Sequence, residues 1–388
     1  MSDYLHMSHG NDSQNDELIA LLDKIFKFPN ERVDTFKTLL PKLYKDKYHP
    51  AQNNIILDVD GDMRAAVGVY YNTMTVGDEC LKTAGIGNVG THPDFEGNGY
   101  MRFCMALALD EMKQNMVDIA LLGGARQRYA HHGFEPAGPR YEFTFCKDNV
   151  KRKFLSDKKS KFTAIPLDET NIEFTNKITE NYNNRIFRTG RTCDNMFDTL
   201  KNWNSTPYVI MENDTFKGWL VFSTLKNSVY EIGCENKEDI EDIIICALET
   251  SGHDSITFAV APCEVELADY LGLNCENYKV DHCEMFNILC FENVIRAFLK
   301  LKSTYTKLSD GELTLLIEGC KLPEQIKISV KNNCVTVCET NEKPDFVLKH
   351  NEAIRLVGSL YSETRDKLPT ECANWFPLPI YISACDTV

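Results

Sequence analysis

The stretch Thr91–Met112, THPDFEGNGYMRFCMALALDEM, decides the fold of this chain. Two glycines flank Asn98, and an apolar run with helical spacing follows at once. One face of that run carries Met101, Cys104, Met105, Ala108 and Met112, which predicts a helix over residues 100–115. The N–H groups that begin a helix lack intrahelical acceptors, and the helix dipole makes them positive. A glycine loop that opens such a helix predicts an anion site suited to a pyrophosphate.

The segments around this loop complete one α+β unit over residues ~14–147. Residues 16–26 have helical spacing and an acidic start. From residue 53 to 90 the pattern alternates and is cut by Asp-Gly and Gly-Asp turns, which predicts an antiparallel meander. After the helix come a short buried strand over 118–122, a glycine pair, a short helix with a turn, and a closing strand.

The segment that follows, residues 147–161, is charged and poor in apolar residues, which predicts a linker. Residues ~162–288 then repeat the strand and helix order of the first unit. At the equivalent strand-to-helix junction this repeat reads CENKEDIED, over residues 234–242. Carboxylates repel phosphates, and a loop without glycine cannot approach them closely. We therefore expect the second unit to be a structural copy that has lost the anion site.

The last hundred residues change pattern again, with an amphipathic helix, four strands, another helix and a proline-bearing tail. The sequence thus predicts three domains in an α+β chain with mixed sheets: 1–150, 151–288 and 289–388. The chain ends on ISACDTV after an apolar segment, so we expect its last residue, Val388, to be docked rather than frayed.

Composition narrows the choice of partners. The 388 residues include 42 Lys and Arg against 57 Asp and Glu, a formal charge of -15, which argues against a nucleic-acid binder. An acidic field concentrates cations and suits a cationic small molecule, although plain solubility is the better explanation of the net charge alone. No apolar run is long enough to span a bilayer, and the 15 scattered cysteines contain no CxxC pair. We expect buried thiols in a reducing cytoplasm.

Two apparent metal motifs fail on inspection, and we expect no metal site. DVDGD at Asp58 begins like a calcium loop, but the sixth and twelfth positions hold Met63 and Val69 rather than Gly and Glu. His131 and His132 are adjacent, so on a helix they point about 100° apart and make poor joint ligands. We expect a hairpin turn at the first motif and a surface or packing role for both histidines.

The loop VGTHPDFEGNGYM resembles the coenzyme A loop of the GNAT acetyltransferase superfamily, Gln/Arg-x-x-Gly-x-Gly/Ala. Two registers are possible, one starting at Glu96 and one at Asp94. Either one puts a carboxylate where the family has Gln or Arg. Because the family loop binds mainly through backbone amides, this carboxylate should weaken binding modestly if it faces the phosphates and not at all if it points to solvent.

A second stretch resembles one branch of that superfamily, the Eis-like (enhanced intracellular survival) multi-acetylating N-acetyltransferases. Their pattern Tyr-x-x-x-Gly-Phe/Tyr-x-Pro-Ala matches Tyr129, Gly133, Phe134, Pro136 and Ala137. The branch also has the predicted three-part order. The resemblance implies an acetyltransferase domain, a second one without the coenzyme loop, and a sterol-carrier-protein-like domain whose last residues reach the active site.

The resemblance implies an N-acetyltransferase that uses acetyl-CoA, acts on a polyamine-like or aminoglycoside-like cation by direct attack, and assembles as a hexamer. It assigns Tyr129 as the general acid and the carboxylate of Val388 as the base. An α-carboxyl has a pKa of about 3.3–3.7, so burial must raise it or it works mainly by orienting the ammonium. The coenzyme-binding residues that it implies are Val89, Gly90, Thr91, Gly97, Asn98, Gly99, Tyr100, Met101, Arg102, Gly124 and Ala125.

A different class of function stays open. The chain could be a non-catalytic acyl-CoA or lipid binder that uses its last domain as the binding module, with Glu96 marking a lapsed enzyme. The Gly-Asn-Gly loop and the Tyr129 pattern speak against that alternative.

Overall fold

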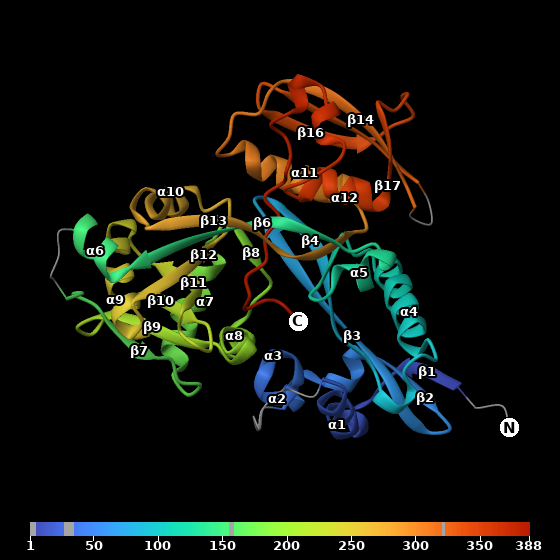
Figure 1. Cartoon of the computed structure of the whole chain (residues 1–388), viewed down its shortest axis with the longest axis horizontal. Helices are drawn as coiled ribbons and strands as arrows, with labels where there is room; N and C mark the ends of the chain where they lie inside the picture. Colours follow the sequence, from blue (N-terminus) through green and yellow to red (C-terminus); the bar gives the residue numbers. More distant parts are fainter. Residues whose placement is uncertain (1–4, 27–34, 155–158, 320–322) are drawn as a thin grey trace.

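The structure is a computed structural model that describes residues 5–26, 35–154, 159–319 and 323–388. In this part of the chain a 13-stranded sheet runs through the first two thirds, and a separate four-stranded sheet forms the last third. Figure 1 shows the four-stranded sheet and its helices above the other two parts. This mixed α/β architecture confirms the predicted fold class. Among the described helices, none is long and apolar enough to cross a bilayer.

The first part contains the predicted meander and the predicted central helix. Its strands are β1 Leu5–His9, β2 Asn54–Val59, β3 Asp62–Val76, β4 Glu79–Thr91, β5 Ile119–Leu122 and β6 Glu135–Cys146. Its α-helices are α1 Asn15–Phe26, α2 Phe36–Leu39, α3 Pro41–Tyr44, α4 Tyr100–Gln114, α5 Arg126–Tyr129 and α6 Lys147–Lys153, with 3-10 turns at Asp12–Gln14, Asp46–Tyr48, Pro50–Asn53, Pro93–Phe95 and Ala130–His132. The DVDGD motif is the tight turn between β2 and β3, as expected.

Helix α6 corrects the sequence interpretation, because its residues were expected to be a linker. Its first turn is tied down: the Asn149 amide donates to the Asn274 carbonyl at 3.0 Å, and Asn149 and Val150 are buried. The many Lys and Arg residues of this segment predicted a linker, and the hydrogen bond to Asn274 has no signal in the local sequence. Of the expected linker, residues 155–158 lie outside the described residues.

The second part repeats the order of the first. Its strands are β7 Thr163–Pro166, β8 Phe187–Thr189, β9 Thr206–Glu212, β10 Thr215–Phe222, β11 Ser228–Cys234, β12 Ser255–Val260 and β13 Asn277–Ile288. Its α-helices are α7 Ile172–Asn183, α8 Cys193–Leu200, α9 Ile240–Ser251 and α10 Val265–Asn274, with 3-10 turns at Asn202–Asn204 and Lys237–Asp239. The run β9-β10-β11-α9-β12-α10-β13 therefore matches β2-β3-β4-α4-β5-α5-β6, and β11–β12 is a parallel pair like β4–β5.

The two parts exchange their last strands. The sheet order is β1-β2-β3-β4-β5-β13-β6-β12-β11-β10-β9-β7, and the thirteenth strand, β8, pairs with β3 outside this order. Strand β13 thus lies beside β5, and β6 lies beside β12. Each exchanged strand packs into the other part's core: Met285 of β13 joins the cluster under α4, and Phe143 and Phe145 of β6 join the cluster under α9. The two parts consequently share one continuous sheet.

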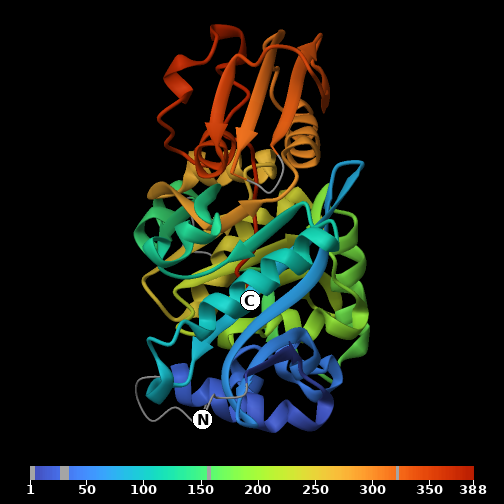
Figure 2. The same cartoon turned by 90° about the vertical axis from the view of Figure 1, so that its right-hand side faces the viewer.

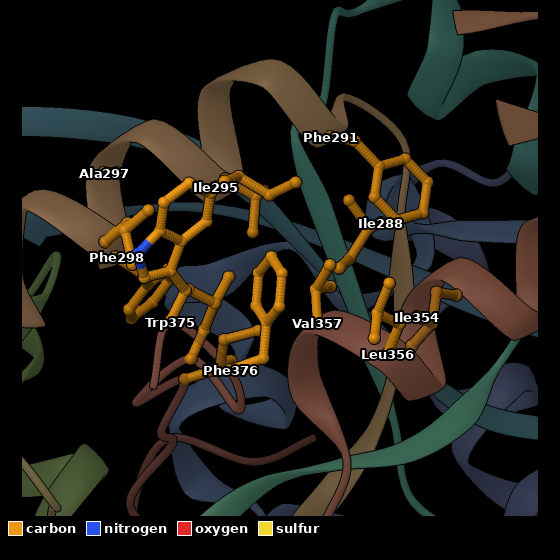
Figure 3. Packing of buried hydrophobic residues seen from close by; sticks show 14 of the residues in the cluster. Ile288, Phe291, Ile295, Ala297, Phe298, Ile354, Leu356, Val357, Trp375 and Phe376 are labelled. Carbon is orange, nitrogen blue, oxygen red and sulfur yellow. The ribbon is translucent and has the colours of Figure 1, made fainter. Parts of the chain in front are cut away.

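The third part packs its helices on one side of its sheet. Its strands are β14 Gly311–Glu318, β15 Glu324–Lys331, β16 Cys334–Glu339 and β17 Phe346–Lys349, and its helices are α11 Phe291–Ser303 and α12 His350–Gly358, with 3-10 turns at Arg365–Lys367 and Thr370–Cys372. Figure 3 shows Trp375 against Ile295 and Phe298 of α11, and Phe376 facing Val357 of α12. From this core the tail, residues 377–388, returns to the middle of the molecule, where both views place the C-terminus (Figures 1 and 2).

Candidate active site

The site begins where two parallel strands part. Strands β4 and β5 pair from Thr83–Ile119 to Ile86–Leu122, after which β5 ends while β4 continues to Thr91. The register of β4 against β3 shifts in the same region, and Asn88 there has a φ of 44°. Such a bulge bends a strand away from its neighbour. The β4 stretch 87–91, which includes the predicted Val89, Gly90 and Thr91, therefore has an edge that β5 leaves unpaired.

A hydrogen-bond network fixes this bulge. The Asn88 side-chain oxygen accepts from the hydroxyls of Tyr44 at 2.6 Å and Tyr70 at 3.1 Å, and its amide donates to Asn54 at 2.7 Å. Gly90 lies under α1, because a Cβ there would come within 2.8 Å of Ile25. Helices α1 and α3 thus hold the bent stretch of β4 in place.

The predicted glycine loop lies at the start of α4. Gly97 and Gly99 have φ values of 86° and 78°, a region that other residues avoid, and a Cβ on either would face open space. Among the described residues, the N–H groups from Gly97 to Met101 have no backbone acceptor, and the first such bond is from Arg102 to the Gly99 carbonyl at 3.0 Å. Open donors at the start of a 15-residue helix are the features that a pyrophosphate needs.

The side chains of this loop divide between core and solvent. Tyr100 is buried in the cluster under α4 and Met101 packs against it, while Asn98 and Arg102 are exposed. The Asn98 amide donates to the Phe95 carbonyl at 3.0 Å, which closes the loop. Glu96 is exposed, so its carboxylate is not forced against the open donors.

Tyr129 lies at the other side of the gap, at the end of α5. Its side chain is only 5% exposed and shares a cluster with Leu122 and Phe134. Gly124, which follows β5, has a φ of 146°, and a Cβ there would lie 2.7 Å from the Tyr129 ring. Burial raises the pKa of the Tyr129 hydroxyl, and Arg128 opposes this only in part. The phenol therefore keeps its proton at neutral pH, beside the exposed backbone of Gly124 and Ala125.

Val388 packs onto β4 at the same place. A Cβ on Gly85 would lie 2.7 Å from a Val388 methyl, and one on Gly87 would lie 3.5 Å from the Val388 carbonyl carbon. Val388 also contacts the cluster of α1, α2 and α3 that contains Tyr44 and Tyr70. The two glycines provide the space that this residue occupies.

The tail reaches this position through buried anchors. Arg191 is 1% exposed and pairs with Glu231 and Asp386, each at 2.7 Å. Burial opposes the charge of Asp386, but Arg191 outweighs it and holds the Asp386 pKa below its usual value. Because two buried carboxylates share this guanidinium, its removal would leave both without their cation and would be costly.

Three further donors bind the tail backbone and side chains. Lys42 donates to the Cys385 carbonyl at 3.0 Å, Asn202 to the Thr387 carbonyl at 2.8 Å, and the Trp203 indole to the Thr387 hydroxyl at 2.8 Å. Burial lowers the pKa of Lys42 to about 8, with Asp386 opposing the shift. The end of the chain is thereby held by residues of both the first and the second part.

Sequence reasoning missed one acidic residue at this site, Glu284 of β13. Its Oε2 lies 3.1 Å from where a Cβ of Gly123 would be. Gly85 of β4 pairs with Leu121 of β5, and residues two apart in a strand share a face, so Gly123 lies on the face of Gly85. Because Met285 pairs with Leu122, Glu284 is opposite Gly123 and lies on this same face, where Val388 also packs. Burial raises the pKa of Glu284 to about 7, with Arg140 opposing. The only sequence signal was an acid between Cys283 and Met285, in the half of the strand that becomes buried.

The histidines beside Tyr129 do not form a joint site. His131 is exposed, and the His132 carbonyl accepts from Asn287 at 2.9 Å. Burial lowers the pKa of His132, and His131 and Arg102 lower it further. Within the described ranges, no cluster of three potential metal ligands occurs.

Residues 6–137 match the family model described as acetyltransferase (GNAT) domain. No curated protein matches the chain significantly. Similar solved structures include a GCN5-related N-acetyltransferase from Anabaena variabilis, with 15% identity, 98% of each chain covered and a TM-score of 0.68.

Two others cover nearly as much of the chain. A GCN5-related N-acetyltransferase from Kribbella flavida is 16% identical, with 90% of this chain and 87% of that one covered and a TM-score of 0.62. Eis1 from Mycobacterium abscessus is 13% identical, with 90% and 88% covered and a TM-score of 0.59. These likenesses agree with the predicted fold over nearly the whole chain. The predicted enzyme class, an acetyltransferase, is confirmed by the match of residues 6–137 to the acetyltransferase (GNAT) domain model.

Proposed function

We propose that this chain transfers the acetyl group of acetyl-CoA to an amine of a cationic small molecule, polyamine-like or aminoglycoside-like, by direct attack. The proposal rests on four features around the β4–β5 gap. They are the open N–H donors at Gly97–Met101, the unpaired edge of β4, the buried Tyr129, and the carboxylates of Val388 and Glu284 on the sheet face of Gly85. The free N–H groups suit the diphosphate and pantetheine arms of acetyl-CoA, and the carboxylates suit a positively charged amine.

Different residues bind the cosubstrate and donate the proton to the leaving group. The N–H groups of the loop and of the β4 stretch 87–91 hold the diphosphate and pantetheine arms, with Gly124 and Ala125 at the rim. The amine nitrogen forms a bond to the acetyl carbon, and the bond from that carbon to sulfur breaks. Tyr129 gives its proton to the leaving thiolate, whose ordinary pKa of about 8.5 is near enough to that of a phenol for efficient transfer.

The ammonium must lose a proton before it can attack, and we propose the carboxylate of Val388 as the base. Glu284 is a second carboxylate on the same face. With a pKa of about 7 it is better matched to proton transfer at neutral pH than an ordinary α-carboxyl. In this arrangement the Val388 carboxylate orients the ammonium and accepts its proton, and Glu284 assists as a second proton acceptor on the same face.

The domain assignments follow from the resemblance to the Eis-like branch. We propose that 1–150 is the catalytic domain, that 151–288 is a second acetyltransferase-like domain without the coenzyme loop, and that 289–388 is sterol-carrier-like. The repeated strand and helix order supports the second assignment. We also propose a homohexamer in the cytoplasm, which sedimentation and fractionation would test. The 14 described cysteines are free thiols, but the expectation that they are buried is wrong for Cys80, Cys193, Cys334 and Cys338, which are exposed.

A thiol-release assay across a panel of amines tests the function. Polyamines and aminoglycosides should release coenzyme A faster than matched alcohols and carboxylates. The base is tested by adding four glycines after Val388, which moves the carboxylate and keeps every side chain. We expect a folded protein that binds acetyl-CoA and has lost most turnover. Full activity in the extended protein would rule out the carboxylate, and no release with any amine would overturn the function.

The alternative of a non-catalytic lipid binder receives no support from the third part. Its interior is filled by Trp375, Phe376 and the buried faces of α11 and α12 (Figure 3). A thermal-shift scan still separates the two functions. Acetyl-CoA at 100-fold over its Kd should stabilise the protein by about 2.7 kcal/mol, while a shift with fatty acids alone would favour the binder.

A further inference from the structure

A cavity of about 820 Å³ lies in the second part, away from the site described above. Strands β11 and β12 pair only at Ser228–Thr257 and Val229–Phe258, and the residues that follow, Tyr230–Cys234 and Ala259, line the cavity. The cavity therefore occupies, in the repeat, the place that the β4–β5 gap occupies in the first part. Its volume is within the range of small-molecule sites.

The lining is aromatic and acidic. Five tyrosines contribute to the walls: Tyr182, Tyr230, Tyr270, Tyr305 and Tyr381. Four carboxylate side chains do so as well: Glu231, Glu264, Glu266 and Asp386. Aromatic faces attract cations because their π-systems carry negative charge above the ring. Carboxylates add to that attraction and repel anions, although Glu231 and Asp386 share the buried Arg191 and contribute less than unpaired groups would.

The repeat has lost the features that would hold phosphates here. The segment that leads from β11 into α9 contains Glu235, Glu238 and Asp239, where the first part has its glycine loop. Lys161 lies at this junction but does not offer its charge to a phosphate, because its ammonium pairs with Asp239 at 2.9 Å and Asp242 at 3.5 Å. An acyl-CoA or nucleotide would thus meet carboxylates at its diphosphate, and these ligands do not fit.

The cationic side chains near the cavity are committed to other groups. Arg185 donates to the Ile232 carbonyl at 2.6 Å and stacks over the rings of Tyr182 and Trp219. Its guanidinium stands 3.7 Å from Glu264, beyond hydrogen-bond distance. Lys237 pairs with Glu266 at the rim.

Glu264 is the lining carboxylate with the loosest ion pair, because Glu231 and Asp386 pair with Arg191 at 2.7 Å and Glu266 pairs with Lys237. It precedes α10, and 30% of its side-chain surface remains exposed. Burial raises its pKa, Arg185 opposes the shift, and Glu231 adds to it. Its charge is therefore only partly compensated by the protein, and an ammonium group would supply the missing partner.

We infer that this cavity is a second small-molecule site, which binds an organic ammonium ion with an aromatic or alkyl body, its charge at Glu264 and its body between the tyrosines. The tail forms one wall through Tyr381, Ser383 and Asp386. Two residues beyond Asp386, Val388 packs on β4, so the occupant contacts the same segment that reaches the active site.

Isothermal titration with a matched set of probes, without acetyl-CoA so that no turnover occurs, tests the site. The set is 2-phenylethylamine, 2-phenylethanol and phenylacetate, which share a body and differ in charge. The variants are Ala259→Leu, which fills the cavity, and Glu264→Gln, which keeps its shape, with Glu249→Gln on the exposed side of α9 as the control. Circular dichroism confirms that each variant is folded.

The amine can also enter the acetyl-acceptor site, so the readout is the binding component that Ala259→Leu removes. We expect this component for the amine in the wild type, about tenfold or more weaker in Glu264→Gln and unchanged in Glu249→Gln. It should persist when four glycines follow Val388, whatever that extension does to turnover. Equal binding in wild type and Ala259→Leu would overturn the inference. So would equal binding of the alcohol or the carboxylate, or an unaltered affinity in Glu264→Gln.

Discussion

The side chain of Val388 lies directly over Gly85, with a methyl group 2.7 Å from the position that a Cβ of Gly85 would occupy. A residue from the end of the chain and one from the middle of β4 thus share a space that only glycine leaves free. The same contact sets how closely the Val388 carboxylate approaches the β4–β5 gap.

Gly85→Ala should displace Val388 and lower turnover. Misplacement of a reacting group by about 1 Å can cost up to 100-fold, so we expect kcat to fall roughly 10–100-fold. Acetyl-CoA affinity should change little, because the glycine loop is untouched. Steady-state kinetics and titration calorimetry measure the two effects. Gly272→Ala, where the new methyl meets only the Phe143 ring at 3.3 Å, is the control. Unchanged kcat in Gly85→Ala would show that the position of Val388 does not matter.

The sequence predicted the local elements of this site because their signals are local. A glycine pair followed by helical spacing specifies the loop and α4, and alternation with Asp-Gly turns specifies β2 and β3. The fold class follows from the order of these elements. Short elements such as β1 and β8 carry too few residues for a periodic signal, and they were not predicted.

The long-range relationships could not be predicted in the same way. Strand β13 is polar in its first half and apolar near its end, and nothing in its own residues predicts that it pairs with β5 rather than with β12. Glu284 enters the site only through that exchange. Likewise Gly85 and Gly87 look like residues that weaken a strand, and their purpose depends on Val388, which is about 300 residues away.

Tyr129→Phe should remove the proton donor and leave the packing intact, since the ring is buried against Gly124. We expect kcat to fall by about 10²–10⁴, the usual weight of a positioned acid, with acetyl-CoA affinity nearly unchanged. Thiol release measured across pH checks the outcome, and Tyr278→Phe at an exposed position is the control. Turnover within a few-fold of the wild type at every pH would exclude Tyr129 as the acid.

Glu284→Gln should flatten the acid limb of the pH profile. If Glu284 with its pKa of about 7 assists in removing the proton, wild-type kcat/KM rises as that group loses its proton. The variant has no titrating group there, so its rate should be lower and less dependent on pH between 6 and 8. Glu276→Gln, at an exposed position beside β13, is the control. An acid limb that persists unchanged would assign the titration to another group.

The same variant makes a prediction about stability. The folded-state pKa of Glu284 is raised from 4.5 to about 7, so the destabilisation by its burial is absent at acid pH, grows between these two values and is complete above about 7. Glu284→Gln should therefore be more stable than the wild type at pH 8 by roughly 1–3 kcal/mol, and the difference should shrink toward pH 4.5. Urea unfolding at both pH values measures it, and a gain that is larger at pH 4.5 would contradict the burial of this carboxyl.

Arg191→Met should destabilise the chain, because Glu231 and Asp386 would stay buried without their shared cation. Removing one member of a buried ion cluster costs about 3–5 kcal/mol. Turnover should fall as well, since Asp386 anchors the tail that ends at Val388. Urea unfolding gives the stability, and Lys177→Met in the exposed Lys177–Glu173 pair should cause no measurable change. Equal stability of the Arg191 and Lys177 variants would show that the cluster does not hold the tail.

Glu96→Arg tests how the loop binds its anion. Glu96 is exposed beside Gly97, and the open N–H groups from Gly97 to Met101 provide the contacts, so the exchange should leave the fold intact. Replacing a negative by a positive charge near a diphosphate should tighten acetyl-CoA binding about 2–10-fold at low ionic strength. The gain should shrink as salt is added, because exposed charges are screened. Titration calorimetry at 20 and 300 mM salt measures it, and Glu249→Arg on α9 reports the effect of net charge alone. A large loss of affinity in Glu96→Arg, absent from the Glu249 variant, would mean that the carboxylate itself organises the loop.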